Sequence, residues 1–380
     1  MIDIPEYNNF IKIVPITKGW SGDKKYCVSK AGGIKYLLRI SPIEQYERKK
    51  SEFEMMQRVA SLGVPMCQPV EFGTCDEGVY SLQSWIDGED AEDKMPYLSD
   101  TQQYQYGIKA GKILKIIHSI PAPDKQENWE SRFNRKLDYK IKGYTDCPIK
   151  YDGGDAFIEY INDNRHLLKN RPQCYQHGDY HIGNMMIDNT GNLIIIDFNR
   201  NDFGDPWEEF NRIVWCAQKS PLFASGMVNG YFDGDVPIDF WRLLALYISS
   251  NTLSSVPWAI PFGQSEVDTM LGQAKEVLQW YDNMKNPVPI WYTDLKPGKC
   301  FCGHDCPCCI TYLATVRNDE NLRIQSQRFY KDAFNLDIPL NEIHCLGGRS
   351  DDIFKLCRDC PWVKCCRERN IDACLKCTEY

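Results

Sequence analysis

The stretch 175-YQHGDYHIGNMMIDNTGNLIIIDF-198 contains two histidines and three aspartates, interrupted by glycines and followed by an apolar run. A zinc protease site needs His-Glu-x-x-His on a helix, but Gly178 and Asp179 follow His177, and glycine disfavours a helix there. A nucleophile elbow needs Gly-x-Ser-x-Gly, and the stretch has no serine. The remaining chemistry to consider is phosphoryl transfer.

The spacing of the polar residues fits phosphoryl transfer. This reaction needs one carboxylate near the attacking hydroxyl, and an amide oxygen with a second carboxylate to hold magnesium. The sequence supplies Asp179, then Asn184 five residues later, then Asp197 after the apolar run LIII. The segment 188-DNTG-191 predicts a hairpin turn that brings the strand before Asp197 back against MMI. Asp197 is therefore expected at the same cleft as Asp179.

The motif HGDYHIGN, with IIDF and GDPWEEF further on, resembles the aminoglycoside phosphotransferase family over roughly residues 10–285. These are small-molecule kinases with a protein-kinase-like fold. The resemblance implies that Asp179 is the catalytic base, that Asn184 and Asp197 are magnesium ligands, and that ATP is the donor, with GTP as the alternative. Gly178 and Asn199 stand where protein kinases have an arginine and a glycine, which implies an enzyme without an activation-loop switch.

Two histidines flank this motif, and for both the more favoured role is a structural one. We expect His177 and His181 to hydrogen-bond the backbone and hold the loop in shape, rather than to carry protons.

A cation for the nucleotide phosphates is expected from the stretch 33-GIKYLLRI-40. Strand alternation places Lys35, Leu37 and Arg39 on one face. Arg39 is preferred because it follows the apolar pair and can grip phosphate oxygens bidentately; Lys35 and a strand-edge charge are the alternatives. On the next helix, predicted over 43–61, Glu52 shares a face with Met55, Met56 and Val59, so we expect Glu52 to pair with Arg39.

The remaining nucleotide contacts are weaker predictions. The turn 19-GWSGDKK-25 would cover the phosphates with backbone N–H groups through Gly19 and Gly22, although two glycines alone are a weak signal. By the fold resemblance, the segment 83-QSWID-87 would hold the purine through the backbone of Ser84 and Ile86.

The predicted fold is α+β and bilobal. It comprises a strand-rich nucleotide-binding lobe over residues 1–87, a helical catalytic and acceptor-binding lobe over 88–290, and a Cys-rich module over 297–380. Acidic segments at 87–93, 204–209 and 233–239 would suit a cationic acceptor such as an aminoglycoside, or are simply solvated. Trp241, Trp258 and Trp280 would shape the acceptor side, or belong to the core. Fold alone does not identify the acceptor.

Twelve of the 18 cysteines lie after residue 299, including three Cys-x2-Cys pairs. Such pairs let two thiolates reach one metal ion, so a zinc module is predicted, with an iron–sulfur site and a disulfide framework as alternatives. The tail resembles a bacterial cysteine-rich family of unknown function, which implies zinc binding and no particular activity. The predicted ligands are Cys302, Cys306, Cys309, Cys345, Cys357, Cys360, Cys374 and Cys377.

The net charge of −8 argues against a nucleic-acid-binding protein. The most apolar stretch, 239–260, is interrupted by charged residues and a proline, and the N-terminus lacks a signal pattern, so a cytoplasmic protein without a membrane segment is expected. A small-molecule hydroxyl acceptor is the expected partner, and a protein partner for the tail is left open. The alternative function is an inactive kinase-like scaffold with a metal- or redox-sensing tail.

Overall fold

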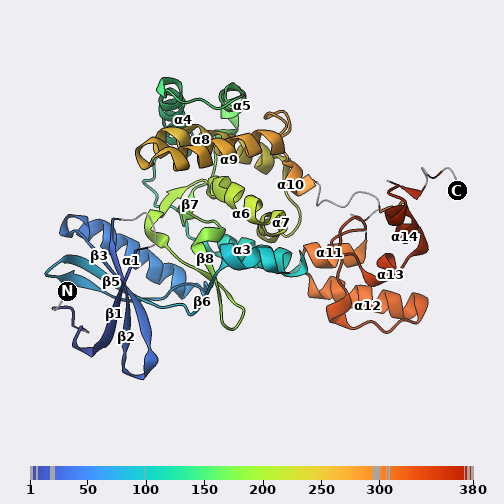
Figure 1. The fold of residues 1–380 in the computed structure, drawn as a ribbon, viewed down its shortest axis with the longest axis horizontal. Coiled ribbons are helices and arrows are strands. Elements are labelled where there is room, and N and C mark those ends of the chain that lie inside the picture. Colours follow the sequence, from blue (N-terminus) through green and yellow to red (C-terminus); the bar gives the residue numbers. More distant parts are fainter. Residues whose placement is uncertain are drawn as a thin grey trace. The chain divides into compact units, whose positions relative to one another are not determined.

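The computed structural model describes residues 3–5, 7–17, 22–98, 100–293, 300–304, 306, 309–371, 373–374 and 377. Two compact units are formed (Figure 1). The first comprises Met1–Lys94, Ile116–Pro121 and Tyr175–Phe203, and the second comprises Met95–Lys115, Ala122–Cys174 and Gly204–Tyr380. The stretch 175–198 therefore packs in the same unit as the N-terminal strands. In the described part of the chain, no helix is both long and apolar enough to cross a membrane.

An antiparallel sheet with the order β1-β2-β3-β5-β4 dominates the first unit. Its strands are β1 Phe10–Ile16, β2 Lys24–Lys30, β3 Lys35–Ser41, β4 Pro69–Cys75 and β5 Gly78–Ser84. Arg39 lies on β3, opposite Lys25 of β2 and Ser81 of β5. Because β3 is paired on both sides, Arg39 is not an edge charge, which removes one of the alternatives considered for it.

One helix, α1 Tyr46–Ser61, covers this sheet, close to the range predicted for it. Its buried residues are Phe53, Met56 and Val59, and Phe53 packs on Phe72 of β4 with ring centroids 5.5 Å apart. The buried stripe therefore begins at Phe53. Glu52 lies beside the stripe with its side chain 13% exposed, so it is near the interior but not within the apolar contact.

The hairpin predicted at 188–191 is confirmed. β8 Met185–Asp188 pairs antiparallel with β9 Leu193–Ile195. Asp188 Oδ1 accepts the N–H groups of Thr190 at 2.9 Å and Asn192 at 2.8 Å, which closes the turn. A third strand, β6 Gly88–Asp90, pairs with β8 on its other side. Its glycine is needed, because a Cβ at Gly88 would lie 2.3 Å from the Ile187 carbonyl oxygen.

The second unit is mainly helical. Its larger helices are α3 Asp100–Ile117 (which extends into the first unit), α4 Trp129–Asp146, α5 Asp155–Asn164, α6 Ile213–Lys219, α7 Pro221–Phe232, α8 Ile238–Ala259 and α9 Gln264–Trp280. α3 and α7 cross at glycines. A Cβ at Gly107 would lie 2.2 Å from the Phe223 carbonyl oxygen, and one at Gly226 would lie 2.3 Å from that of Tyr104. Small residues thus allow the two backbones to approach closely.

A buried carboxylate ties the GDPWEE segment to the helices of this unit. Asp205 is fully buried and accepts from Arg171 at 2.6 and 2.9 Å and from the Tyr247 hydroxyl at 2.6 Å. The Arg171 guanidinium in turn lies 3.8 Å from the centre of the Trp207 ring. A buried network whose members are all hydrogen-bonded has a structural role. Asp205 is therefore not a solvated loop residue, which was one of the two alternatives for this segment. The network gives no sign of an acceptor site at 204–209.

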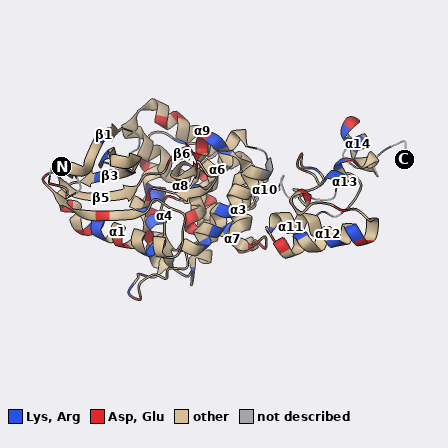
Figure 2. Cartoon of the chain, turned by 90° about the horizontal axis from the view of Figure 1, so that it is seen from below, with Lys and Arg blue, Asp and Glu red and all other residues tan. Residues whose placement is uncertain are grey.

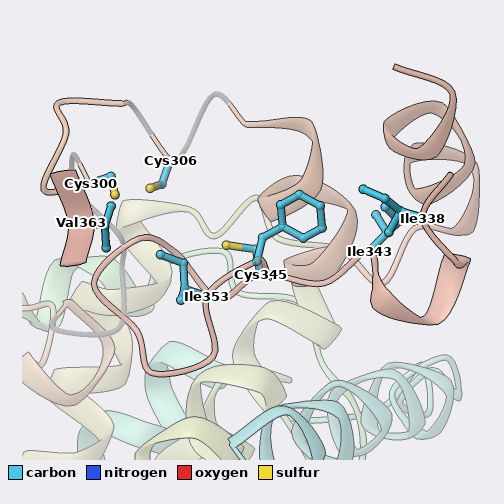
Figure 3. Packing of buried hydrophobic residues seen from close by; sticks show 8 residues of the cluster. Cys300, Cys306, Ile338, Ile343, Cys345, Ile353 and Val363 are labelled. Atoms are coloured by element: carbon cyan, nitrogen blue, oxygen red, sulfur yellow. The ribbon is translucent and has the colours of Figure 1, made fainter. Parts of the chain in front are cut away.

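The tail belongs to the second unit and contains α11 Ile310–Val316, α12 Glu320–Phe334, α13 Lys355–Arg358 and α14 Pro361–Glu368. Acidic and basic residues are interspersed along α12 (Figure 2). Cys300, Cys306 and Cys345 supply part of the tail's core, together with Ile343 and Val363 (Figure 3). Cysteines therefore take positions that a larger module would fill with aliphatic side chains.

Candidate active site

The loop that carries Asp179 turns at a glycine whose backbone is left-handed. Gly178 has φ +82°, and a Cβ there would lie 1.8 Å from the Arg200 carbonyl oxygen. No side chain fits this space without moving the backbone of Arg200. The sequence analysis interpreted the glycine at this position, in place of an arginine, as the sign of a missing activation-loop switch. The structure adds a steric reason for the glycine.

Both histidines of the motif bond to the loop backbone, as expected. His177 is fully buried, its Nε2 lies 3.0 Å from the Ile196 carbonyl oxygen, and its Nδ1 accepts the N–H of Asp179 at 3.3 Å. His181 Nδ1 accepts the N–H of Gly183 at 3.2 Å. These bonds fix the backbone on each side of Asp179.

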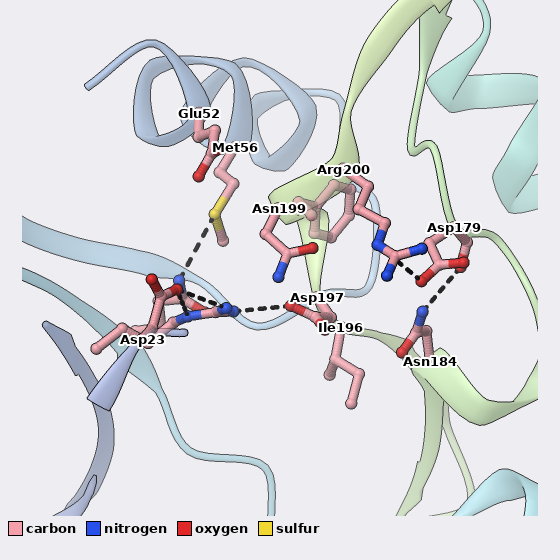
Figure 4. Close-up of polar contacts among 12 residues, drawn as sticks. Asp23, Glu52, Met56, Asp179, Asn184, Ile196, Asp197, Asn199 and Arg200 are labelled. Carbon is pink, nitrogen blue, oxygen red and sulfur yellow. Dashed lines mark hydrogen bonds and ion pairs between the residues drawn. The ribbon is translucent and has the colours of Figure 1, made fainter. Parts of the chain in front are cut away.

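The three residues of the predicted phosphoryl-transfer motif lie in one unit and close to one another (Figure 4). Asn184 Nδ2 donates to the Asp179 carbonyl oxygen at 2.9 Å, which leaves its amide oxygen as the atom for a ligand. Asp197 follows β9 in a left-handed conformation, with φ 67° and ψ 61°. The Asp179 carboxylate lies 3.7 Å from His181 Nε2 and 3.8 Å from Arg200 Nε.

Arg39 is the buried cation of the site. Its Nη1 donates to Asp197 Oδ1 at 2.8 Å, and its Nε and Nη2 donate to Asp23 Oδ2 at 3.3 and 3.0 Å. Burial opposes the charged form of Arg39, but Asp197 and Asp23 outweigh it and raise its pKa. Lys35, the alternative, forms an exposed pair with Asp87 at 2.6 Å, so the structure favours Arg39.

The expected pair between Arg39 and Glu52 is wrong in this structure. Glu52 instead accepts from Lys49 at 3.0 Å and from Arg48 at 2.9 Å, both on its own helix. Helix periodicity correctly predicted that Glu52 lies near the interior. It did not predict that Lys49, one turn earlier, pairs with Glu52, or that Asp23, directly before β2, pairs with Arg39. Lys49 Nζ lies 3.3 Å from Asp23 Oδ2, so Glu52 reaches Arg39 only through two intermediates.

The structure describes three of the four other residues that were predicted to contact the nucleotide. The Ser84 and Trp85 N–H groups already donate to the carbonyl oxygens of Gln68 and Lys35, so Ser84 has only its carbonyl to offer a base. Ile86 lies in the half-buried segment after β5, outside regular structure. Gly22 is exposed, and a Cβ there would meet nothing within 4 Å. Gly19 lies outside the described residues.

A model described as the phosphotransferase enzyme family matches residues 12–243, more than half of the 380-residue chain. The chain belongs to this family. The prediction of a phosphotransferase enzyme is thereby confirmed. Among curated proteins, no sequence matches this phosphotransferase.

Solved structures share the fold of this phosphotransferase at low sequence identity. One is a choline/ethanolamine kinase family protein from Mesorhizobium loti, with TM-score 0.56 and 15% identity over 75% of this chain and 95% of that chain. A thermostable mutant of aminoglycoside phosphotransferase APH(4)-Ia, in ternary complex with ADP and hygromycin B, gives 0.52 and 15% over 72% and 95%. The GDP complex of a mutant aminoglycoside 2'-phosphotransferase-IIIa gives 0.53 and 14% over 73% and 94%. The predicted kinase-like α+β fold is confirmed.

The tail, residues 299–380, matches a model described as a protein of unknown function (DUF3795), which confirms the resemblance noted from its cysteines. Cys306 and Cys345 accept N–H groups from Gly348 and Gly347, each at 3.3 Å. Among the described residues, however, only Asp3, Cys75 and Asp76 bring three ligand atoms within 4.8 Å of one another. The eight predicted cysteines are thus not gathered into closed sites, and metal binding by the tail stays a prediction. No disulfide joins any of the described cysteines.

Proposed function

We propose that the chain transfers the γ-phosphate of ATP to a hydroxyl of a small molecule, with Asp179 as the general base. The observation that carries the proposal is the arrangement of Asp179, Asn184 and Asp197 around one loop and hairpin. Asn184 joins the two ends of this arrangement, since its side chain bonds the Asp179 backbone while its own carbonyl oxygen accepts the N–H of Ile196 at 3.0 Å. Asp179 would accept the hydroxyl proton as that oxygen attacks phosphorus.

The donor set of this loop fits magnesium. Asn184 offers an amide oxygen, and Asp197 offers a carboxylate with its side chain 37% exposed, and magnesium prefers oxygen ligands of this kind. When bound, the ion would neutralise charge on the phosphate oxygens. Arg39 would then share its charge between Asp197 and the phosphates, which its planar fork suits. ATP is the proposed nucleotide, and GTP is the alternative, because similar structures are described with ADP and with GDP.

For the acceptor we propose a cationic molecule with a hydroxyl group, of the aminoglycoside kind. The acidic segment 87–93 belongs to the same unit as Asp179, and β6 within it pairs with the strand that follows the catalytic loop. Glu92 lies close enough to the loop that its Oε2 would be 3.1 Å from a Cβ at Gly183. A carboxylate at this point would attract a cationic substrate. Similar structures are described with hygromycin B and gentamicin.

The proposal is tested by nucleotide binding in the presence and absence of magnesium. Asn184→Ala and Asp197→Ala should each weaken binding of ATP with magnesium by at least about tenfold, the effect of one lost ligand interaction, while binding without magnesium changes less. Asp146→Ala, which breaks an exposed pair with Lys142 on α4, is the control and should leave both affinities unchanged. Equal affinities in wild type, Asn184→Ala and Asp197→Ala would contradict the assignment of these ligands.

For the tail we propose zinc bound by cysteine thiolates, with Cys306 and Cys345 among the ligands. Thiolates suit zinc and iron–sulfur clusters alike, and zinc is preferred because the phosphotransferase chemistry needs no electron transfer. The amide N–H groups of Gly348 and Gly347, which point at these two sulfurs, support the proposal, since such donors stabilise negative charge on sulfur. Cys300 joins the buried sulfur group, although it is not among the ligands that the sequence suggested.

A further inference from the structure

Asp23 accepts bonds from two cations of the site, Arg39 and Lys49, although the sequence assigned it no role. It lies directly before β2 with its side chain 5% exposed. Its Oδ2 accepts from Arg39 Nε at 3.3 Å, from Arg39 Nη2 at 3.0 Å and from Lys49 Nζ at 3.3 Å. Its Oδ1 accepts from the Ser41 hydroxyl at 2.7 Å. Both carboxylate oxygens are therefore used, by donors from β3 and α1.

These contacts determine how the Arg39 guanidinium is turned. Asp23 takes the Nε edge of the fork, through Nε and Nη2. The remaining nitrogen, Nη1, is thereby directed at Asp197, which it reaches at 2.8 Å. Without Asp23, Asp197 would be the one anionic group among the described residues that bonds the guanidinium, and the side chain could rotate about that single bond.

Asp23 also takes the place that a helix carboxylate was expected to take. Glu52 of α1 bonds Lys49, and Lys49 bonds Asp23, so the helix presents a cation to the sheet. Arg39, which is buried, and Lys49, whose side chain is 14% exposed, then share one carboxylate. Burial opposes the charged form of Asp23, but the Ser41 hydroxyl, Arg39 and Lys49 outweigh it and hold its pKa below the ordinary value. A carboxylate in this setting is ionised at neutral pH.

We propose that Asp23 is the positioning residue for Arg39 and thereby sets the affinity of the site for nucleotide phosphates. The inference rests on the proposed function, because Arg39 acts on phosphate only if the chain binds a nucleotide. Asp23 acts through Arg39: it fixes the fork and neutralises Lys49 and touches no reacting atom. Loss of an oriented, charge-assisted hydrogen bond typically weakens binding about ten- to hundredfold, and that is the size of effect expected here.

The test measures ATP binding, KM and kcat of the full chain with magnesium. Asp23→Asn should raise Kd and KM for ATP by about ten- to hundredfold and change kcat less, because Asp179 is untouched. Asp23→Glu should recover part of the affinity. Glu77→Gln, which breaks the surface pair of Glu77 with Lys24 at 2.6 Å, is the matched control and should behave as wild type. Unchanged Kd and KM in a folded Asp23→Asn chain would overturn the inference.

A second variant guards against loss of folding. Ser41→Ala removes the hydroxyl that donates to Asp23 Oδ1 and keeps the charges of Asp23 and Arg39. A loss of ATP affinity smaller than that of Asp23→Asn is expected. Unchanged ATP affinity in Ser41→Ala would count against the inference. In the Arg39→Ala background, Asp23→Asn should add almost nothing to the loss of ATP affinity.

If the wild-type chain neither binds ATP with magnesium nor transfers phosphate, the proposed function fails. The contact between Asp23 and Arg39 would then be tested by urea unfolding of wild type, Asp23→Asn, Arg39→Ala and the double variant. Strictly additive shifts of the unfolding midpoint would overturn the contact.

Discussion

Arg39 Nη1 and Asp197 Oδ1 lie 2.8 Å apart although the residues are 158 positions apart in sequence. The strand cation thus contacts the proposed magnesium ligand directly, and Asp23 holds its other edge. Glu52 is linked to Arg39 only through Lys49 and Asp23. Because Arg39 contacts Asp23 but not Glu52, the two pairs of substitutions should differ in their coupling.

Arg39→Ala and Glu52→Ala should couple more weakly in the free energy of unfolding than Arg39→Ala and Asp23→Ala, because Lys49 and Asp23 lie between them. Distant residues without shared partners usually add within about 0.5 kcal/mol, whereas residues in contact or in one salt-bridge network deviate by about 0.5–3 kcal/mol. The pair Arg39→Ala and Asp23→Ala should therefore show the larger coupling. Urea unfolding of the four chains of each cycle measures both. A coupling for Arg39 with Glu52 as large as that with Asp23 would restore the direct pair that the sequence suggested.

Gly178→Ala should destabilise the chain strongly. The left-handed backbone alone costs a side chain about 1–3 kcal/mol, and the clash with the Arg200 carbonyl oxygen at 1.8 Å adds to it. Gly143→Ala is the matched control, because Gly143 lies within α4, where a Cβ meets nothing within 4 Å. That change should stabilise the chain by about 0.5–1 kcal/mol. Thermal melts of the two variants check the contrast, and similar melting temperatures would show that the loop is not constrained as described.

Stability should depend on pH through Asp23. Its folded pKa lies below the ordinary 3.8, so its stabilising contribution is fully present above that ordinary value and is lost as pH falls through the folded pKa. Arg39 and Lys49 are the cations that face it. The difference in unfolding free energy between wild type and Asp23→Asn should therefore be larger at about pH 6 than at about pH 3. A difference that grows toward acid would mean that the folded pKa is raised.

Removal of metal should unfold the tail and leave the body folded. A small module in which cysteines replace aliphatic residues has too little core to fold well without metal. Elemental analysis of the full chain should find zinc, and Cys306→Ser or Cys345→Ser should reduce it. Cys27→Ser, in the sheet of the first unit, should retain wild-type zinc. A full chain that contains no metal and melts identically with and without chelator would contradict the proposal.

The sequence predicted the parts of the site whose spacing is local. The Asp179–Asn184–Asp197 motif, its hairpin and α1 are each specified by neighbouring residues, so periodicity and turn chemistry reveal them. Asp23 could not be found in this way, because its partners come from β3 and α1 and depend on tertiary packing. The same applies to the α3–α7 crossing: Gly107 and Gly226 are unremarkable singly, and only the helix contact explains them.

Transfer of the ATP γ-phosphate to a small-molecule hydroxyl should depend on Asp179 as the base. The measurement is transfer of labelled phosphate from ATP with magnesium to a panel of aminoglycosides and other small alcohols, for wild type and Asp179→Asn, with ATP affinity measured in parallel. We expect wild type to phosphorylate a panel member. Asp179→Asn should retain ATP binding and the fold but lose transfer by about two to four orders of magnitude. Near-normal transfer by a folded Asp179→Asn chain would show that Asp179 is not the base.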